Sequence, residues 1–336
     1  MSTASTNPII TIVVPVYNAE AYLRECLQSI AAQTFGNFRV LIIDDASTDS
    51  SCKIAEEFCF CDARFELLTI EHGGVSKARN TGIAHTATKY ISFVDADDML
   101  HPQMLEMLLK TATDLQDAQA VICGMVRGER CPFKSLPDKQ QQEYAVKDIA
   151  GKATIYTYQE AMRAALYQSV ILNSPCGLLL DTSLLTPEAL FREGTRFEDL
   201  DAFYRYLEGA WRIAVIPQKL YFYRTNPQSF MNRWSTERLD VLDVVDRMTN
   251  WMHQRYPELD AAVADRSFSA HFNTLLLLYR HRIDNSNAEK RCIGVIQNLR
   301  RAELTNPDVR LKNKAGALLS YPGSPVLRIA SRFYFL

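Results

Sequence analysis

IITIVVPV, residues 9–16, is an unbroken run of apolar and β-branched residues. It is followed by AEAYLRECLQSIAAQTF (19–35), in which apolar residues recur at helical spacing. Further apolar runs continue this alternation with helical or polar segments at FRVLIID (38–44), FELLTI (65–70), KYISFV (89–94) and VICGMV (121–126). Apolar strands separated by single helices are typical of strand–helix–strand units. The sequence therefore predicts an α/β fold with a mostly parallel sheet flanked by helices.

Polar and acidic residues follow four of these runs. The carboxyl ends of parallel strands meet along one edge of a sheet, and ligands bind in the crevice beyond that edge. The four segments are Pro15-Val16-Tyr17-Asn18, Asp44-Asp45, His72-Gly73-Gly74 and Asp95-Ala96-Asp97-Asp98. Chance explains one such cluster easily but four poorly, so we expect a ligand site at this edge.

The acidic segment after YISFV is the strongest candidate for a metal site. If it is extended, alternate side chains point the same way, which places Asp95 and Asp97 on one side. Two carboxylates suit Mg²⁺ or Mn²⁺, and unpaired carboxylates this close repel each other and favour a cation. A solvated acidic loop that caps the next helix is the alternative.

Two other segments at this edge have a functional and a plainer interpretation. Asp45 can accept the N–H of a nucleobase, whereas residues 47–49 favour a turn with a helix cap. GVSKARNTG (74–82) matches neither the dinucleotide fingerprint nor the phosphate-binding P-loop. Its Arg79 could still pair with an acidic metal site or contact a diphosphate, although an exposed basic helix face is the alternative.

Composition excludes several classes of protein. The chain has 336 residues and a net charge of −2, which argues against a nucleic-acid-binding protein. It lacks a run of about 18 or more apolar residues, so we expect no spanning helix, and a secretory signal is not recognisable at its start. The eight cysteines lack zinc-site spacing and are expected to be free thiols in a reducing, cytoplasmic compartment.

The second half of the chain is less regular. Residues 127–155 form a polar excursion with a Gln run, and helices are expected at 157–170 and 197–210. WRIAVIP and KLYFYRT (211–225) are predicted to form two strands, and the pattern from 236 to about 304 is helical. We therefore expect one domain over 1–235 and a helical region over 236–336.

Five motifs occur in the order that is typical of inverting family 2 glycosyltransferases. They are VVPVYN, IIDDASTDS, GVSKARNTG, FVDADD and RFEDLD. The resemblance covers residues 9 to about 235, and YFYRTNPQSFM (221–231) is similar to the family's segment after the acceptor region. It implies a GT-A fold with a donor half at about 9–126 and an acceptor half at about 127–235. It also implies a nucleotide-sugar donor, most often a UDP-sugar.

The resemblance carries roles to individual residues. The implied donor-binding residues are Pro15, Val16, Tyr17, Asn18, Asp45, Arg79, Asp95 and Arg224. Asp97 is implied as the direct ligand of Mn²⁺ or Mg²⁺, with Asp95 near the metal and ribose and Asp98 able to share that role. Asp199 matches the catalytic base, beside Glu198, and would take the acceptor hydroxyl's proton during a single inverting displacement. Without the resemblance, these two acidic residues would be explained by the preference of a helix N-terminus for negative charge.

The chain departs from the family at one segment, Ser174 to Leu180. Many relatives have an aromatic residue where Cys176 stands and a Lys where Leu178 stands. This departure favours an alternative, a transferase-like module that binds a nucleotide or glycan with impaired turnover. A haloacid-dehalogenase-type phosphatase is a weaker alternative, because its Asp-x-Asp motif follows the first strand and the motif here follows the fourth.

The expected partners are a nucleotide-sugar and a glycan or lipid-linked glycan acceptor, as in lipopolysaccharide, capsule or exopolysaccharide synthesis. The C-terminal segment SPVLRIASRFYFL mixes Arg with apolar residues, as an interfacial helix does. Contact with the inner face of the cytoplasmic membrane, a homodimer contact and ordinary packing against the core are the alternatives for this tail.

Overall fold

The computed structural model describes residues 7–135, 152–225 and 234–333, which form two compact units. Unit 1 comprises Met1–Tyr158, Asn173–Gly194 and Ala202–Pro227. Unit 2 comprises Gln159–Leu172, Thr195–Asp201 and Gln228–Leu336. Two segments before residue 235 thus belong to the same unit as the C-terminal helices, and the predicted boundary at 235 stays a prediction. The Gln run at 140–142 lies outside the described residues.

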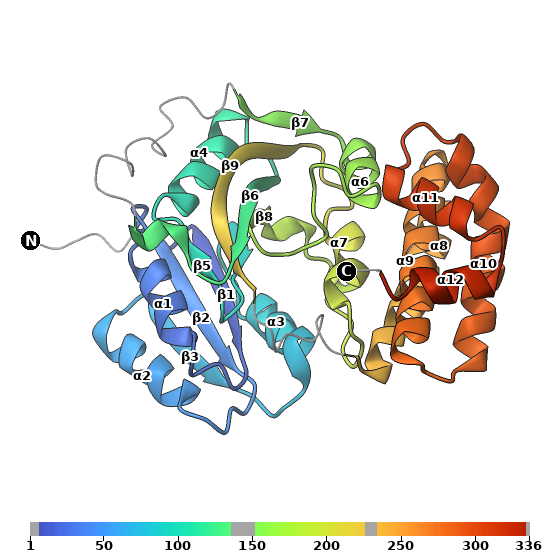
Figure 1. Cartoon of the computed structure of the whole chain (residues 1–336). Helices are drawn as coiled ribbons and strands as arrows, with labels where there is room; N and C mark the ends of the chain where they lie inside the picture. Colours follow the sequence, from blue (N-terminus) through green and yellow to red (C-terminus); the bar gives the residue numbers. More distant parts are fainter. Residues whose placement is uncertain (1–6, 136–151, 226–233, 334–336) are drawn as a thin grey trace, which may run out of the picture. The chain divides into compact units, whose positions relative to one another are not determined.

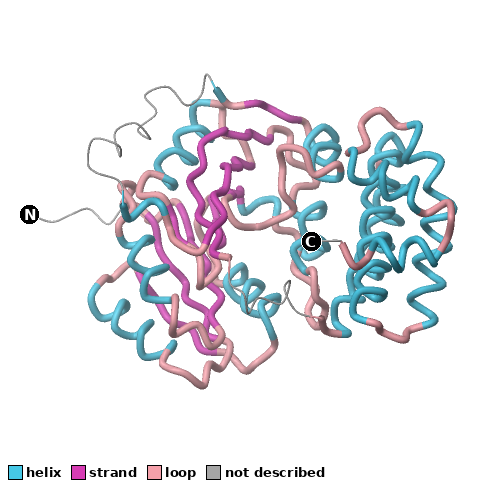
Figure 2. Tube along the Cα trace, viewed as in Figure 1, coloured by secondary structure: helices cyan, strands magenta, loops and turns pink. Residues whose placement is uncertain are grey.

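Unit 1 is built on one sheet, to which nine of the described strands contribute (Figures 1 and 2). In chain order, the strands are β1 (Ile10–Val16), β2 (Phe38–Asp44), β3 (Phe65–Thr69), β4 (Tyr90–Phe93), β5 (Met99–Leu100), β6 (Ala120–Gly128), β7 (Thr154–Tyr156), β8 (Leu178–Asp181) and β9 (Ile213–Arg224). The order in space is β3-β2-β1-β4-β8-β6-β9-β5, with β7 paired to β9. The predicted fold class is confirmed.

The first four strands are parallel, and β8 runs antiparallel to both of its neighbours, β4 and β6. The parallel strands β1 and β2 are buried almost throughout, which explains their continuous apolar sequences. Their carboxyl ends lie in register, since Val16 is the partner of Asp44. The loops after β1 and β2 therefore emerge side by side.

Helices cover both faces of this parallel part. α1 (Leu23–Ala31) and α2 (Ser51–Cys61) lie on one side of it, and α3 (Gly74–Ala84) lies on the other (Figure 1). α3 approaches β1 very closely, because a Cβ at Gly82 would lie 2.4 Å from Val13 Cγ1. α4 (Met104–Asp114) follows the acidic turn and packs against β6, β8 and β9.

Unit 2 is helical. Its long helices are α8 (Asp240–Arg255), α9 (Asp260–His281) and α10 (Ser286–Thr305), and two shorter ones follow, α11 (Leu311–Leu319) and α12 (Ser324–Ala330). α9 is the central helix and packs against the other four. Most of α6 (Tyr158–Leu166) and the first turn of α7 (Glu198–Tyr206) also belong to this unit.

The structure differs from the sequence-based prediction in several strands, since β5, β7 and β8 were not expected. Residues 211–225 were expected to form two strands, but Ile213–Arg224 forms a single strand, β9. Its pairing with β6 shifts register between Ile122 and Gly124, opposite the segment that contains Pro217. The irregularity accommodates a residue without a backbone N–H, so the proline bends the strand without ending it.

The part of the chain that the structure describes contains no helix long and apolar enough to cross a membrane. All eight cysteines are free thiols, as predicted.

Candidate active site

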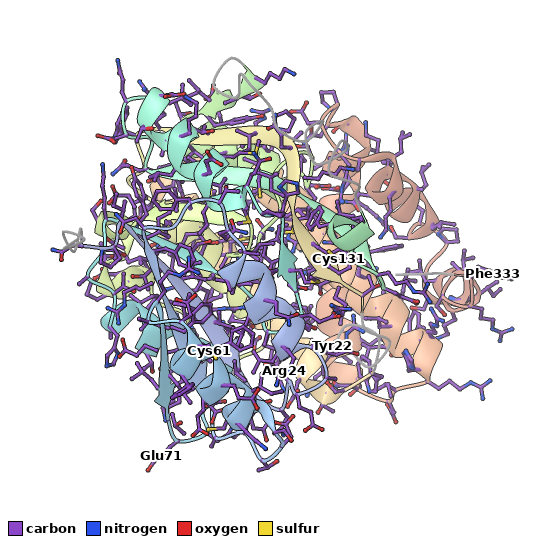
Figure 3. The ribbon with its side chains drawn as sticks, turned by 90° about the vertical axis from the view of Figure 1, so that its left-hand side faces the viewer. Tyr22, Arg24, Cys61, Glu71, Cys131 and Phe333 are labelled. Carbon is purple, nitrogen blue, oxygen red and sulfur yellow. The ribbon has the colours of Figure 1, made fainter. Side chains whose placement is uncertain are left out.

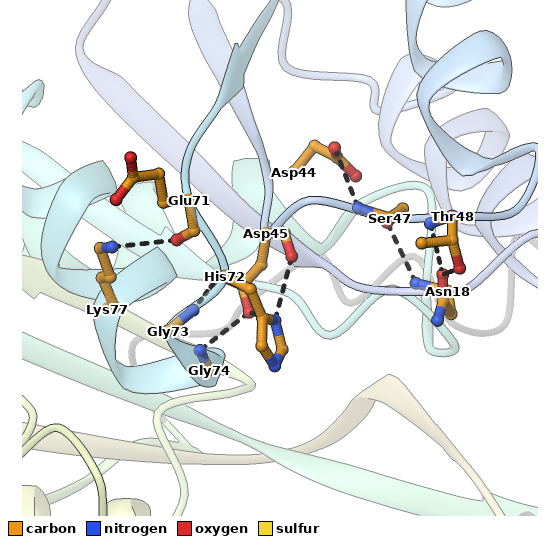
Figure 4. Close-up of polar contacts among 10 residues, drawn as sticks. All are labelled: Asn18, Asp44, Asp45, Ser47, Thr48, Glu71, His72, Gly73, Gly74 and Lys77. Atoms are coloured by element: carbon orange, nitrogen blue, oxygen red, sulfur yellow. Dashed lines mark hydrogen bonds and ion pairs between the residues drawn. The ribbon is translucent and has the colours of Figure 1, made fainter.

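The loops after β1 and β2 are joined by side-chain hydrogen bonds (Figure 4). The Asn18 N–H donates to Ser47 Oγ at 3.1 Å, and Asn18 Oδ1 accepts from the Thr48 N–H at 2.8 Å. Asn18 has a φ of 49°, a left-handed conformation that Asn tolerates better than most residues. Asn18 thus fixes one loop against the other, while Pro15 and Val16 are buried in β1.

Asp45 organises the start of α3 (Figure 4). Its carboxylate oxygens accept the backbone N–H groups of Gly73 and Gly74, each at 2.8 Å. The His72 ring lies 3.0 Å from Asp45 Oδ2 and 4.5 Å, centroid to centroid, from the ring of Tyr17. Because the Asp45 carboxylate is only 3% exposed, the surfaces this cluster offers to a flat ligand are the half-exposed rings of Tyr17 and His72.

The acidic segment Asp95 to Asp98 is a turn rather than an extended strand. β4 ends at Phe93, and the Asp98 N–H donates to the Asp95 carbonyl at 3.0 Å. The alternation argument for placing Asp95 and Asp97 on one side therefore does not apply locally. The argument from repulsion between carboxylates still applies, because Asp95, Asp97 and Asp98 lie within four consecutive residues.

A buried arginine holds Asp95. Arg79 Nη2, on α3, lies 2.8 Å from Asp95 Oδ1, and the Arg79 side chain is 4% exposed. Its guanidinium also lies over the Phe191 ring, 5.2 Å from the centroid. A guanidinium fixed in this way orients the carboxylate, whose side chain stays 32% exposed. Arg79 is therefore a charge partner of the acidic turn, one of the two roles predicted for it.

Asp98 is buried and anchors β9 to the turn. Its Oδ2 accepts from the Tyr221 hydroxyl at 2.6 Å, and its Oδ1 accepts from the Arg224 N–H at 2.8 Å. The Tyr221 hydroxyl also accepts from the Asp95 N–H at 3.2 Å. Both oxygens of Asp98 thus bind protein groups, whereas Asp95 and Asp97 are less buried.

The Arg224 side chain braces the same turn from the other side. Its Nε donates to the Asp97 carbonyl at 2.8 Å, and its Nη2 lies 2.7 Å from Glu25 Oε2 on α1. The guanidinium also lies 4.9 Å from the centroid of Tyr22, which is labelled in Figure 3. These contacts make Arg224 a positioning residue for the turn.

Burial and neighbouring negative charge raise the pKa of two carboxyls in the turn. Burial and the charge of Asp95 raise the pKa of Asp97 to about 6. Burial and the charges of Asp95 and Asp97 raise the pKa of Asp98 to about 8, against the hydrogen bonds from Tyr221 and Arg224. The turn therefore holds more negative charge than its neighbours neutralise, which is the electrostatic condition a divalent cation satisfies.

Cys176 lies beside the turn, at the position where the sequence departs from the family. Potential ligand atoms of Asp95, Asp98 and Cys176 all lie within 4.8 Å of one another. Burial and the charge of Asp95 raise the pKa of the Cys176 thiol well above its ordinary value, so the thiol is neutral and a poor ligand for a hard cation. Asp97 does not belong to this group. By donor chemistry, the less buried carboxylates of Asp95 and Asp97 suit Mn²⁺ or Mg²⁺ better than the thiol does. The second departure, Leu178, is buried in β8.

Glu198 and Asp199 form the first turn of α7 and belong to unit 2. Asp199 Oδ1 accepts from the Leu200 N–H at 2.7 Å. Burial lowers the pKa of Arg266 to about 10, and the charge of Asp199 acts in the opposite direction, so the two side chains interact. The catalytic role of Glu198 and Asp199 stays a prediction, and Ser229 of the YFYRTNPQSFM motif lies outside the described residues.

Sequence reasoning missed the roles of Tyr221 and Glu25. Nothing local distinguishes Tyr221 from Tyr223, because both belong to the same apolar strand sequence. Its partner Asp98 is 123 positions away along the chain. Only the pairing of β5 with β9 brings the two together.

Comparison with known proteins decides the family. The model of glycosyl transferase family 2 matches residues 11–183. The chain belongs to this family. The glycosyltransferase GlyG of Streptococcus pneumoniae serotype 4, one relative of the chain, is 31% identical over 244 residues, which cover 69% of this chain and 78% of GlyG.

Solved structures agree in fold. S. aureus TarS 1–349, in complex with UDP-GlcNAc, superposes with a TM-score of 0.68 at 20% identity, over 96% of this chain and 90% of that one. The mannosyltransferase PcManGT from Pyrobaculum calidifontis, in complex with GDP-Man and Mn²⁺, gives a TM-score of 0.54 at 17% identity, over 98% and 87%. The family 2 assignment and the GT-A fold expected from the motifs are confirmed.

Proposed function

We propose that this family 2 glycosyltransferase moves a sugar from a UDP-sugar to a hydroxyl of a glycan or lipid-linked glycan, with inversion at the anomeric carbon. The observation that carries the proposal is the braced acidic turn at the carboxyl edge of the sheet. Arg79 orients Asp95, and Tyr221 and Arg224 hold Asp98, so that the carboxylates of Asp95 and Asp97 are left for a ligand.

The neighbouring loops support a nucleotide at the same edge. Tyr17 and His72 offer half-exposed rings, and Asp45 fixes the loop that carries His72. Val16 and Asp44 are register partners, so these loops leave the sheet next to one another. In this proposal the base lies against the rings and the diphosphate extends toward the acidic turn. TarS, the similar structure above, was solved with UDP-GlcNAc.

Asp95 and Asp97 would hold Mn²⁺ or Mg²⁺ in the proposed enzyme. When bound, such an ion neutralises the negative charge that develops on the leaving diphosphate. The ion pair with Arg79 keeps the Asp95 carboxylate oriented. Arg224, through the Asp97 carbonyl and Glu25, fixes the backbone of the turn.

The proposed reaction is a single displacement. The acceptor oxygen bonds to the anomeric carbon while the bond from that carbon to the diphosphate oxygen breaks, and UDP leaves. Asp199 takes the proton of the acceptor hydroxyl, in the role that the RFEDLD motif implies. No covalent intermediate on the protein is needed.

The first test is a thermal-shift screen of UDP, GDP, CDP and dTDP and their sugars, each with and without Mn²⁺. A ligand that binds only the folded state raises the melting temperature. We expect Mn²⁺-dependent stabilisation by UDP that is lost in Asp97→Asn. Asp117→Asn is the matched control, because Asp117 is an exposed aspartate in the same unit.

The second test separates binding from turnover. Asp199→Asn should retain the shift with UDP and Mn²⁺ but lose sugar transfer, since it removes only the proton acceptor. Stabilisation by none of the nucleotides would contradict the proposed donor site. Binding without transfer or hydrolysis across all donors and a panel of glycan acceptors would favour the impaired-module alternative.

A further inference from the structure

Helix α11 of unit 2 exposes large apolar residues on its outward side. Asn313, Gly316 and Ala317 face inward and are buried. The contact with α9 is close, because a Cβ at Gly316 would lie 2.9 Å from the Phe272 ring. On the opposite side, Leu311 is 84% exposed and Leu318, one heptad later, is 60% exposed. Large apolar residues therefore stand exposed on α11 together with Lys312, whereas an ordinary solvent-facing helix surface is polar.

Exposed apolar residues continue beyond α11. Tyr321 is 51% exposed, Ile329 on α12 is 58% exposed and Phe333 is 74% exposed; Phe333 is labelled in Figure 3. Of the twelve large apolar side chains that are exposed in the described part of the chain, six lie between residues 311 and 333. Leu327 alone of the apolar residues of α12 is fully buried, so ordinary packing accounts for only part of this tail.

The same segment is strongly basic. Residues 309–336 contain five Lys and Arg and no Asp or Glu. The net charge of the whole chain is −2, so the remaining residues carry −7. Arg328, Lys312 and Arg332 are all exposed, and Arg328 is paired with Glu289 at 2.9 Å. Arg300 of α10 lies over the Tyr321 ring, 4.1 Å from its centroid, which places another cation beside an exposed aromatic.

We propose that the outward side of α11, with Tyr321 and the exposed residues of α12, docks on the anionic surface of a phospholipid bilayer. Exposed Leu and aromatic side chains enter the boundary between headgroups and acyl chains, while Lys and Arg contact anionic headgroups. A two-fold contact between copies would bring these positive segments together, which charge repulsion disfavours. This docking does not depend on the nature of the sugar donor.

The test is flotation of the full chain with vesicles. One set contains phosphatidylcholine alone, and the other an equal mixture of phosphatidylcholine and phosphatidylglycerol. We expect binding to the mixed vesicles, little binding to phosphatidylcholine, and release as salt is raised, since salt screens headgroup attraction. The double variant Leu311→Ser/Leu318→Ser should bind about tenfold more weakly, because it removes the exposed apolar anchors.

Phe60→Ser is the matched control, because Phe60 on α2 of unit 1 is 93% exposed. It should bind the vesicles as the parent does. An unchanged melting temperature of Leu311→Ser/Leu318→Ser verifies that the fold is intact. No flotation with the mixed vesicles would overturn the proposal, as would equal binding by the double variant. A dimer in solution that the double variant disrupts, without vesicle binding, would assign this surface to a second copy instead.

Discussion

Unit 1 and unit 2 each contain a crowded acidic cluster, and the two differ in exposure. In unit 1, the turn from Asp95 to Asp98 keeps the side chain of Asp95 32% exposed. In unit 2, Asp265 is 0% and Glu303 1% exposed, and Asn313 Nδ2 donates to Asp265 Oδ1 at 2.6 Å. Burial, followed by the neighbouring carboxyls, raises the pKa of one carboxyl in each cluster, Asp98 and Glu303, to about 8.

A raised carboxyl pKa therefore does not by itself indicate a functional site. The Asp265–Glu303 pair is enclosed by helices, and the raised pKa of Glu303 favours its neutral form beside Asp265. The unit 1 turn lies at the carboxyl edge of a parallel sheet, where its less buried oxygens can meet a ligand.

The largest effect is expected from Asp97→Asn. We expect sugar transfer to fall by on the order of a hundredfold or more, because the substitution removes a charge placed to hold the cation at the leaving group. Glu303→Gln should leave transfer within about twofold, since its cluster is internal. Steady-state transfer to a glycan acceptor measures both. Equal losses in the two variants would remove the distinction between the clusters.

Tyr221→Phe comes next. It removes the hydroxyl that bonds Asp98 Oδ2 and the Asp95 N–H, leaving a buried carboxylate oxygen without its partner. We expect the free energy of unfolding to fall by about 1–3 kcal/mol, measured by denaturant titration. Tyr17→Phe is the control, because Tyr17 is 50% exposed. If the free energy of unfolding falls equally in both variants, the hydrogen bond from the buried Tyr221 hydroxyl to Asp98 does not stabilise the fold.

Glu303→Gln should change how stability depends on pH. Burial and the hydrogen bond with Asp265 raise the pKa of Glu303 from 4.5 to about 8. Between these values the folded state binds more protons than the unfolded state, so the free energy of unfolding falls as pH rises. We expect Glu303→Gln to reduce this fall by on the order of 1–2 kcal/mol between about pH 5 and about pH 8. Denaturant titrations at several pH values measure it, and an unchanged slope would contradict the internal pair.

The smallest effect concerns the cation. Burial and the charge of Asp95 raise the pKa of Asp97 from 3.8 to about 6, so a proton competes with a cation below that pH. Without a cation, this group makes the folded state less stable as pH rises through that range. With UDP present, Mn²⁺ should raise the melting temperature by roughly 2–6 °C at about pH 8 and by less at about pH 5.5. The pH dependence should disappear in Asp97→Asn, and its persistence there would place the cation elsewhere.

Much of unit 1 could be predicted from local patterns. The strands that became β1, β2 and β4 are apolar runs buried on both faces, which produces that pattern wherever it occurs. The runs that became β3 and β6 were predicted as well, although β3 is an edge strand and only partly buried. The acidic turn follows the fourth strand, as expected. The assumption that Asp95 and Asp97 extend the strand was wrong, because the hydrogen bond from Asp98 to Asp95 closes a turn. A single hydrogen bond of this kind has no signature in residue spacing.

The α/β class, the family motifs and the residue types at the sheet edge could be predicted from the chain alone, because these depend on periodicity and on chain order. The tertiary structure alone decided the task of each side chain. In the folded chain, both oxygens of Asp98 accept hydrogen bonds, from Tyr221 and Arg224. Asp45 accepts a backbone N–H at the start of α3. The first turn of α7 belongs to the same unit as the C-terminal helices. The reason is physical: hydrogen bonds between residues far apart in the chain depend on strand register and helix packing, which no local pattern records.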